Sequence, residues 1–72
     1  MKKYPVESTA MTAVGYDAVE RILEIQFKNG GAIRHYYEVP QELFDEFMAA
    51  ESQGDFFNTN IEGKFSEKRV DG

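Results

Sequence analysis

The stretch LEIQFKNGGAIRHYYEV, residues Leu23 to Val39, predicts a β-hairpin and decides the fold of the chain. In its first part Leu23, Ile25 and Phe27 alternate with polar residues, which is the period of a half-buried strand. Asn-Gly follows at positions 29 and 30, and this dipeptide is a strong short-range signal for a hairpin turn. Residues from Ala32 to Val39 then form the predicted return strand.

The length of the hairpin loop decides which side chains of the return strand are buried. A two-residue loop pairs Lys28 with Gly31 and puts Arg34 and Tyr36 on the apolar face of the first strand. A three-residue loop pairs Lys28 with Ala32 and exchanges the faces. The side chains then buried are those of Ile33, His35, Tyr37 and Val39. Because this second set is more apolar, and because a three-residue loop favours glycine at its left-handed position, we expect the three-residue loop and an exposed Tyr36.

The segment VPQELFDEFMAAESQG, which ends at Gly54, predicts an amphipathic helix from Pro40 to Ser52. Proline suits the first helical turn, and the acid that follows it suits the positive end of the helix dipole. Gly54 is the expected C-terminal stop. The apolar stripe of this helix consists of Leu43, Phe47 and Ala50, widened by Phe44 and Met48.

The flanking segments complete the predicted fold. Residues Met11 to Tyr16 favour a further strand, and Asn58 or Asn60 could cap a short helix that carries Ile61 and Phe65. We therefore expect an α+β domain: a three-stranded antiparallel meander with one packed helix and a short C-terminal helix. The domain should span residues 6–66, with residues 1–5 and 67–72 flexible.

The composition restricts the classes of function. The chain has 72 residues, no cysteine and one histidine, so it has room for one small domain and lacks a disulfide framework or a thiolate zinc site. Its acids do not follow a calcium-loop spacing, and we expect no metal and no cofactor. No apolar run is long enough to span a membrane and the N-terminus lacks a signal peptide, so the expected location is the cytoplasm.

Charge is unevenly distributed along the chain. The formal net charge is -5, and the segment from Glu38 to Asp55 holds acids but no lysine or arginine. A run of this kind is usually the solvated face of a helix. His35 could lie near Glu24 across the hairpin, but the three serines carry no nucleophile motif, so we expect no catalytic residue.

The order of these segments resembles a known family. "VGYD" at Val14 to Asp17, the "NG" turn, "VP" at Val39 and Pro40, "SQG" at Ser52 to Gly54 and "FFN" together resemble the KTSC domain, over residues 6 to 66. That family is named for a C-terminal extension of some lysyl-tRNA synthetases and also occurs as small bacterial proteins. The resemblance implies no catalytic activity and no cofactor, and it suggests RNA binding.

One feature of the family is changed in this chain. The Tyr-x-Tyr motif that precedes Val-Pro in the family falls on Arg34 to Tyr36 when counted back from Val39, or on Ile33 to His35 when counted forward from the turn. At most one of its two tyrosines is kept.

The candidate recognition surface consists of Lys28, Arg34 and Tyr36. An exposed Arg-Tyr pair beside a lysine could stack a base or hold a peptide. We expect a non-catalytic interaction module that binds an unknown protein or itself, through a sheet edge or exposed aromatic residues. Weak RNA binding is the alternative, and an uncharacterised enzyme is the third and least favoured reading.

Overall fold

The sheet is larger than the sequence predicts. The computed structural model describes residues 2–6 and 8–71, and five strands in this part of the chain form one antiparallel sheet in the order β1-β2-β3-β4-β5. The strands are β1 (Lys3–Pro5), β2 (Met11–Asp17), β3 (Ile22–Phe27), β4 (Ile33–Tyr36) and β5 (Glu67–Arg69). The α+β class and the central meander are confirmed, but the three-stranded sheet was wrong. Edge strands β1 and β5 lie in the terminal segments that we expected to be flexible.

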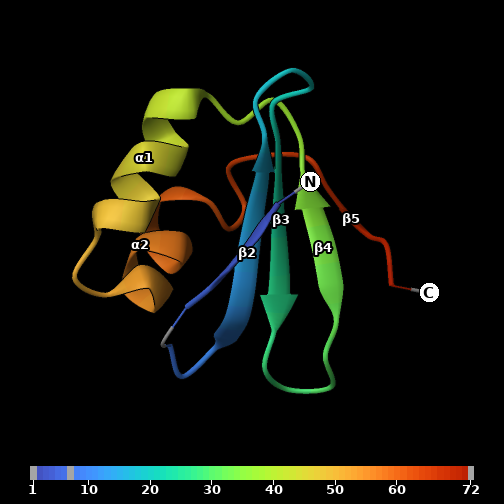
Figure 1. Ribbon diagram of the computed structural model, residues 1–72, viewed down its shortest axis with the longest axis vertical. Coiled ribbons are helices and arrows are strands. Elements are labelled where there is room, and N and C mark those ends of the chain that lie inside the picture. The colour runs from blue at the N-terminus through green and yellow to red at the C-terminus, as the bar shows by residue number, and fades with distance from the viewer. Residues whose placement is uncertain (1, 7, 72) are drawn as a thin grey trace.

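Both helices, α1 (Gln41–Ala49) and α2 (Gln53–Asn60), lie on the same side of the sheet (Figure 1). Their apolar side chains and those of the central strands form one core. Its buried members are Met11, Val14, Leu23, Ile25, Tyr36, Val39, Phe44, Phe47, Phe57 and Ile61. The other side of the sheet is covered by no described helix or strand, and we call it the open face.

Helix α1 begins where the sequence predicts it. Pro40 is the N-cap residue, with φ of -68°, which suits the fixed backbone of proline. Phe44 and Phe47 are its buried residues, while Leu43 and Met48 pack at the edge of the core. The predicted stripe is therefore present, with its deepest part on the two phenylalanines.

The helix ends earlier than predicted, at Ala49. Ser52 is the N-cap of α2, and its Oγ accepts a hydrogen bond from the backbone N–H of Asp55 at 3.3 Å. Serine satisfies a free N–H better at this position than inside a helix, so the chain starts a second helix there. Gly54 lies in the first turn of α2 and is not a stop, and the predicted cap at Asn58 or Asn60 was wrong.

The hairpin between β3 and β4 has a different loop from the one we expected. Leu23 pairs with Tyr36, and the backbone N–H of Phe27 donates to the carbonyl of Ala32 at 2.8 Å. The loop between that bonded pair is four residues long, and its two glycines have φ of 75° and 67°. A four-residue loop keeps the same faces together as a two-residue loop, so the prediction of the three-residue register was wrong.

Candidate functional site

The hairpin register separates the three residues of the predicted recognition surface. Tyr36 is 1% exposed and belongs to the core, so the prediction of an exposed Tyr36 was wrong. Arg34 pairs with Ile25 in the sheet and shares the helix-covered face with Tyr36. Lys28 is exposed in the loop after β3. The structure thus brings Arg34 and Tyr36 together but leaves Lys28 apart, and the three do not form one flat exposed platform.

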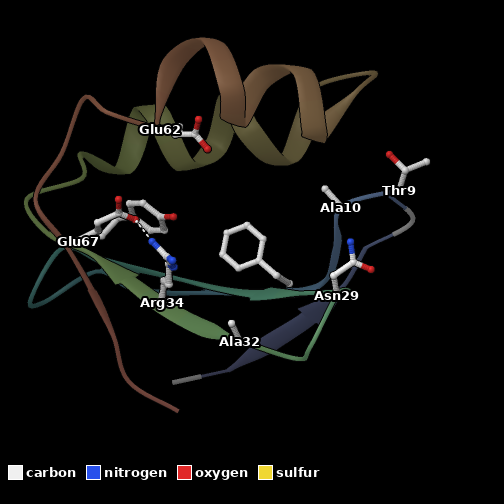
Figure 2. A pocket seen from close by; sticks show the side chains of 9 residues that line it. Thr9, Ala10, Asn29, Ala32, Arg34, Glu62 and Glu67 are labelled. Atoms are coloured by element: carbon white, nitrogen blue, oxygen red, sulfur yellow. Dashed lines mark hydrogen bonds and ion pairs between the residues drawn. The ribbon is translucent and has the colours of Figure 1, made fainter. Parts of the chain in front are cut away.

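Arg34 and Tyr36 instead line a cavity of about 640 Å³ on the helix-covered side of the sheet. Figure 2 shows it between the strands below and the helices above, with Glu62 on the helical side and Arg34, Ala32 and Asn29 on the side of the sheet. The full set of lining residues is Thr9, Ala10, Phe27, Asn29, Ala32, Arg34, Tyr36, Glu62 and Glu67. Cavities of this volume with a mixed apolar and polar lining are a usual form of ligand site.

Charged groups gather at one end of this cavity. Arg34 Nη1 donates to Glu67 Oε2 at 3.2 Å, an ion pair that joins β4 to β5. Burial raises the pKa of the Tyr36 hydroxyl, and the neighbouring carboxylates of Glu67 and Glu62 raise it further. The phenol therefore stays protonated at neutral pH and can donate a hydrogen bond.

The open face carries a row of charged residues across the sheet. The register places Lys3, Gly15, Glu24, His35 and Lys68 side by side on β1 to β5. His35 Nε2 lies 2.7 Å from Glu24 Oε1, which confirms the predicted contact across the hairpin. Lys3 Nζ lies 2.9 Å from Glu24 Oε2. That oxygen is buried and has no partner in hydrogen-bond geometry, so the contact with Lys3 is an ion pair without an aligned hydrogen bond.

Glu24 is held in its charged form by these neighbours. Its side chain is 13% exposed, and burial by itself would raise its pKa. The hydrogen bonds and positive charges supplied by His35 and Lys3 outweigh burial, so the net effect lowers the pKa of Glu24 below its usual value of 4.5. The carboxylate is ionised at neutral pH, and its contacts with Lys3 and His35 connect strands β1, β3 and β4.

Two of the three serine hydroxyls take part in local backbone structure. Ser8 Oγ accepts from the backbone N–H of Ala10, and Ser52 caps α2, so both hydroxyls are engaged in local structure. Residues 2–6 and 8–71 contain no group of three or more histidines or acids arranged to hold a metal ion. No helix in this part of the chain is long and apolar enough to cross a membrane.

The class that this architecture defines is a small α+β domain with both helices on one face of an antiparallel meander. The chain belongs to the KTSC domain family, whose model matches residues 7–65, and the predicted resemblance is confirmed. The crystal structure of a KTSC domain protein from Yersinia pestis superposes with a TM-score of 0.92 at 39% identity and covers 96% of each chain.

Two relatives extend the comparison. A protein of Tsukamurella paurometabola is 52% identical over 61 residues, which is 85% of this chain and 90% of that one. An uncharacterised protein of Stutzerimonas stutzeri is 36% identical over 58 residues, covering 81% and 80%. These similarities establish the family and the fold and specify no activity or partner.

Several residues of these two surfaces were not predicted. Glu62 and Glu67 lie at the cavity, and Lys3 and Lys68 lie in the row of the open face. Lys3, Glu67 and Lys68 are in terminal segments without a clear apolar period. The run of three charged residues from Glu67 to Arg69 was the one signal in the sequence, because charged edge strands protect a sheet against pairing with other chains.

Proposed function

We propose that this chain is a non-catalytic binding module that contacts a partner protein through the open face of its sheet. The observation that supports this most is the row in which Lys3 and His35 hold Glu24 in place on an uncovered sheet. A recognition surface gains affinity when its polar groups are already fixed before the partner arrives, because less side-chain entropy is lost on binding. The absence of cysteine favours the cytoplasm as the place where it acts.

The apolar part of this face has the composition of an interface. Ile22, Ile33 and Tyr37 are neighbours of the charged row and are partly exposed. The His35 and Tyr37 rings meet edge to face with their centroids 6.4 Å apart. Aromatic side chains surrounded by polar groups are enriched at protein interfaces.

The charges indicate an acidic partner segment. Glu24 is already paired, and Lys68 forms no ion pair among the described residues. The acids of the segment from Glu38 to Asp55 lie in or beside the two helices, on the other side of the sheet (Figure 1). An acidic segment would therefore be attracted to the open face and repelled by the helical side.

The face is a better docking surface than the sheet edges. β5 consists of three exposed charged residues, Glu67 to Arg69, and β1 contains Pro5. Lysine and proline on edge strands oppose the addition of another strand. Self-association through an edge, which the sequence left open, is accordingly less favoured than contact through the face.

The test is a comparative capture from a lysate of the source organism with three immobilised proteins. The wild type is compared with a double variant of the open face, Tyr37→Ser with Lys68→Glu, and with Glu46→Lys on the exposed side of α1 as a control. We expect proteins that bind the wild type and the control, resist ribonuclease, and are lost with the double variant. Equal capture by all three immobilised proteins would exclude the open face as the binding surface. Loss of the captured proteins after ribonuclease treatment would show that the face binds RNA.

RNA is the second candidate, favoured by His35 and Tyr37 beside Lys68. Aromatic rings on an open antiparallel sheet can stack unpaired bases. Three lysines, at positions 3, 28 and 68, could contact phosphates, so the salt slope should be no steeper than about -2, at ~0.7 per contact. Fluorescence anisotropy of labelled single-stranded RNA at several salt concentrations measures this slope, and Tyr37→Ser should weaken binding. Absence of binding at low salt would remove RNA.

A further inference from the structure

The cavity beside β4 lies on the other side of the sheet from the proposed docking face, and its chemistry indicates a ligand of its own. We propose that this cavity binds a cation carried on an apolar stem, such as an alkyl or arylalkyl ammonium or guanidinium group. Free amines and the side chains of lysine or arginine in a peptide share this chemistry. The inference does not depend on the docking face.

The floor of the cavity is preformed and aromatic. Phe27 and Tyr36 both line it, but Phe27 is partly exposed while Tyr36 is 1% exposed, so Phe27 supplies the accessible ring. Phe57 of α2 contacts both rings. The Phe57 ring meets Phe27 edge to face with centroids 5.7 Å apart and meets Tyr36 in the same way at 5.6 Å. Edge-to-face contacts restrict the orientation of aromatic rings, so an apolar stem would meet a rigid surface. Aromatic faces also attract cations.

The charges at the rim favour a cation over an anion. Arg34 is the basic residue among the lining side chains, and it is already paired with Glu67 at 3.2 Å. Glu62 forms no ion pair among the described residues. The lining therefore has one net negative charge, and Glu62 supplies a carboxylate without a cationic partner. An anion would have to displace Glu67 from Arg34 and approach Glu62.

The surroundings of the Tyr36 hydroxyl also favour a positively charged ligand. Beyond the effect of burial, Glu67 and Glu62 raise the pKa of this hydroxyl, while the positive charge of Arg34 opposes them without reversing the shift. A negative potential at this hydroxyl is the environment that an ammonium or guanidinium group seeks. The apolar stem would then lie along the floor towards Ala32 and Ala10, which also line the cavity.

The affinity should be modest. The cavity is open to solvent, and Glu62 is exposed, so its ion pair with a ligand would be partly screened. We expect a dissociation constant of roughly 1 mM for a small aromatic amine. Loss of the Glu62 charge should weaken binding about twofold to fivefold, the factor that an exposed ion pair typically contributes.

The experiment is a titration followed by NMR amide shifts, with 2-phenylethylamine as the probe and 2-phenylethanol and 3-phenylpropionate as its neutral and anionic counterparts. The amine should bind more tightly than either and shift the amides of Phe27, Ala32 and Arg34. Glu62→Gln should weaken the amine about twofold to fivefold and leave the alcohol unchanged. Glu46→Gln, an exposed acid on α1, is the control and should change neither.

Equal affinity of the amine and the alcohol, or an amine affinity unaffected by Glu62→Gln, would overturn the proposal. Shifts confined to the open face would overturn it as well, while leaving the proposed docking function intact. A second arm with acetyl-Phe-Lys-amide identifies the source of the cation. Tighter binding of the peptide than of the free amine assigns the site to a protein segment, and the reverse order assigns it to a small amine.

Discussion

Tyr36 and Tyr37 are adjacent residues with opposite environments, and this pair offers a direct test of the hairpin register. Tyr36 is buried between the sheet and Phe57, whereas Tyr37 is partly exposed on the open face. Tyr36→Ala should therefore lower the free energy of unfolding by about 3–5 kcal/mol, as other large-to-small changes in a core do. Tyr37→Ala should lower it by roughly 1 kcal/mol or less. Urea denaturation of the two variants measures the ranking, and a reversed order would contradict this register.

The choice between these tyrosines could not be made from the side chains themselves. Tyrosine fits a buried or a half-exposed strand position. Of the more apolar alternate set, Ile33, His35 and Tyr37 lie on the open face, while Val39, beyond the end of β4, is buried in the core as expected. The loop length decides the outcome, and a four-residue loop was not among the alternatives that the Asn-Gly signal suggested. The contact between Glu24 and His35 was suggested because the two residues lie on paired strands of one hairpin, but it depends on the same register, since the three-residue loop would place their side chains on opposite faces of the sheet.

Glu24 predicts how stability depends on pH. Its pKa is lowered in the folded state, chiefly by His35 and Lys3 against the opposing effect of burial. Near pH 4.5, the ordinary pKa of Glu24, the unfolded chain therefore binds more protons than the folded protein. The folding stability that Glu24 contributes is complete above about pH 4.5. This contribution is lost as the pH falls through the lower folded value.

The variant that tests this is Glu24→Gln, which cannot ionise. Its stability should fall less steeply than that of the wild type on acidification below about pH 4.5, as followed by urea denaturation at a series of pH values. Glu46→Gln, which replaces an exposed acid on α1, should retain the wild-type slope. Identical slopes for wild type and Glu24→Gln would show that the ion pairs of the open face do not contribute to stability.

At the scale of the elements, the two glycines of the hairpin loop have a defined conformational role. Gly31 has φ of 67° with open space around its Cα, so a side chain there would meet backbone strain and no clash. Gly31→Ala should cost about 1–2 kcal/mol, the penalty of a left-handed alanine, and Gly31→Asn should cost less. Gly54→Ala is a control that should raise stability instead. Gly54 is helical, and a Cβ there would make an ordinary contact with Ser8 Oγ at 3.5 Å.

Thermal or chemical denaturation should therefore separate these substitutions. Gly54→Ala is expected to stabilise the protein by roughly 0.5–1 kcal/mol, the usual gain of alanine over glycine within a helix. If Gly31→Ala were also neutral or stabilising, the loop would have to adopt a conformation other than the one described.

Ser52 decides where one helix ends and the next begins. Ser52→Ala removes the acceptor for the backbone N–H of Asp55 and should cost about 1 kcal/mol. Ser66 is an exposed serine before β5 whose side chain forms no hydrogen bond with the described residues, so Ser66→Ala should cost much less. Denaturation curves of both variants test this, and equal effects would mean that Ser52 is not a working N-cap.

The sequence contains a signal for the helix boundary at Ser52, but the apolar period before it outweighed that signal. Serine followed three residues later by an acid is a helix-start signal, and residues Ser52 to Asp55 carry it. The apolar period before it runs as far as Ala50, which favoured one long helix with Gly54 as its stop. The capping signal was the better guide, because an N-cap serine satisfies backbone groups that a continuous helix would not leave free.

At the scale of the whole molecule, the central part of the fold was predictable and the edges were not. The hairpin, the helix that begins after Pro40 and the burial of their apolar stripes follow from local periods of two and 3.6 residues. The edge strands β1 and β5 have no such period, since all six of their residues are exposed. They are defined by backbone pairing with strands far away in sequence, and no local pattern encodes that pairing. The cavity depends on the same long-range placement, because Glu67 reaches Arg34 only when β5 is in the sheet.

This division predicts the effect of removing the edges. Every buried residue of the described chain lies between Met11 and Ile61, so chains that lack residues 1–5 or 67–72 should keep the core and unfold cooperatively. Each truncation removes a few backbone hydrogen bonds, such as the one from Val70 N–H to the Ile33 carbonyl at 2.8 Å. At 0.5–1.5 kcal/mol for each bond, the expected loss is roughly 1–3 kcal/mol, measurable by urea denaturation.

Both truncations should lower solubility. Removal of residues 67–72 exposes β4 as a new edge and removal of residues 1–5 exposes β2, and neither strand has the dense charge of β5 or the proline of β1. An unprotected edge promotes pairing between chains, so both truncated chains should form dimers or aggregates at concentrations where the wild type stays unchanged. Light scattering after size-exclusion chromatography distinguishes these outcomes. If the variant without β5 stayed monomeric and fully stable, β5 would have no protective role, and the ion pair between Arg34 and Glu67 would be dispensable for the fold.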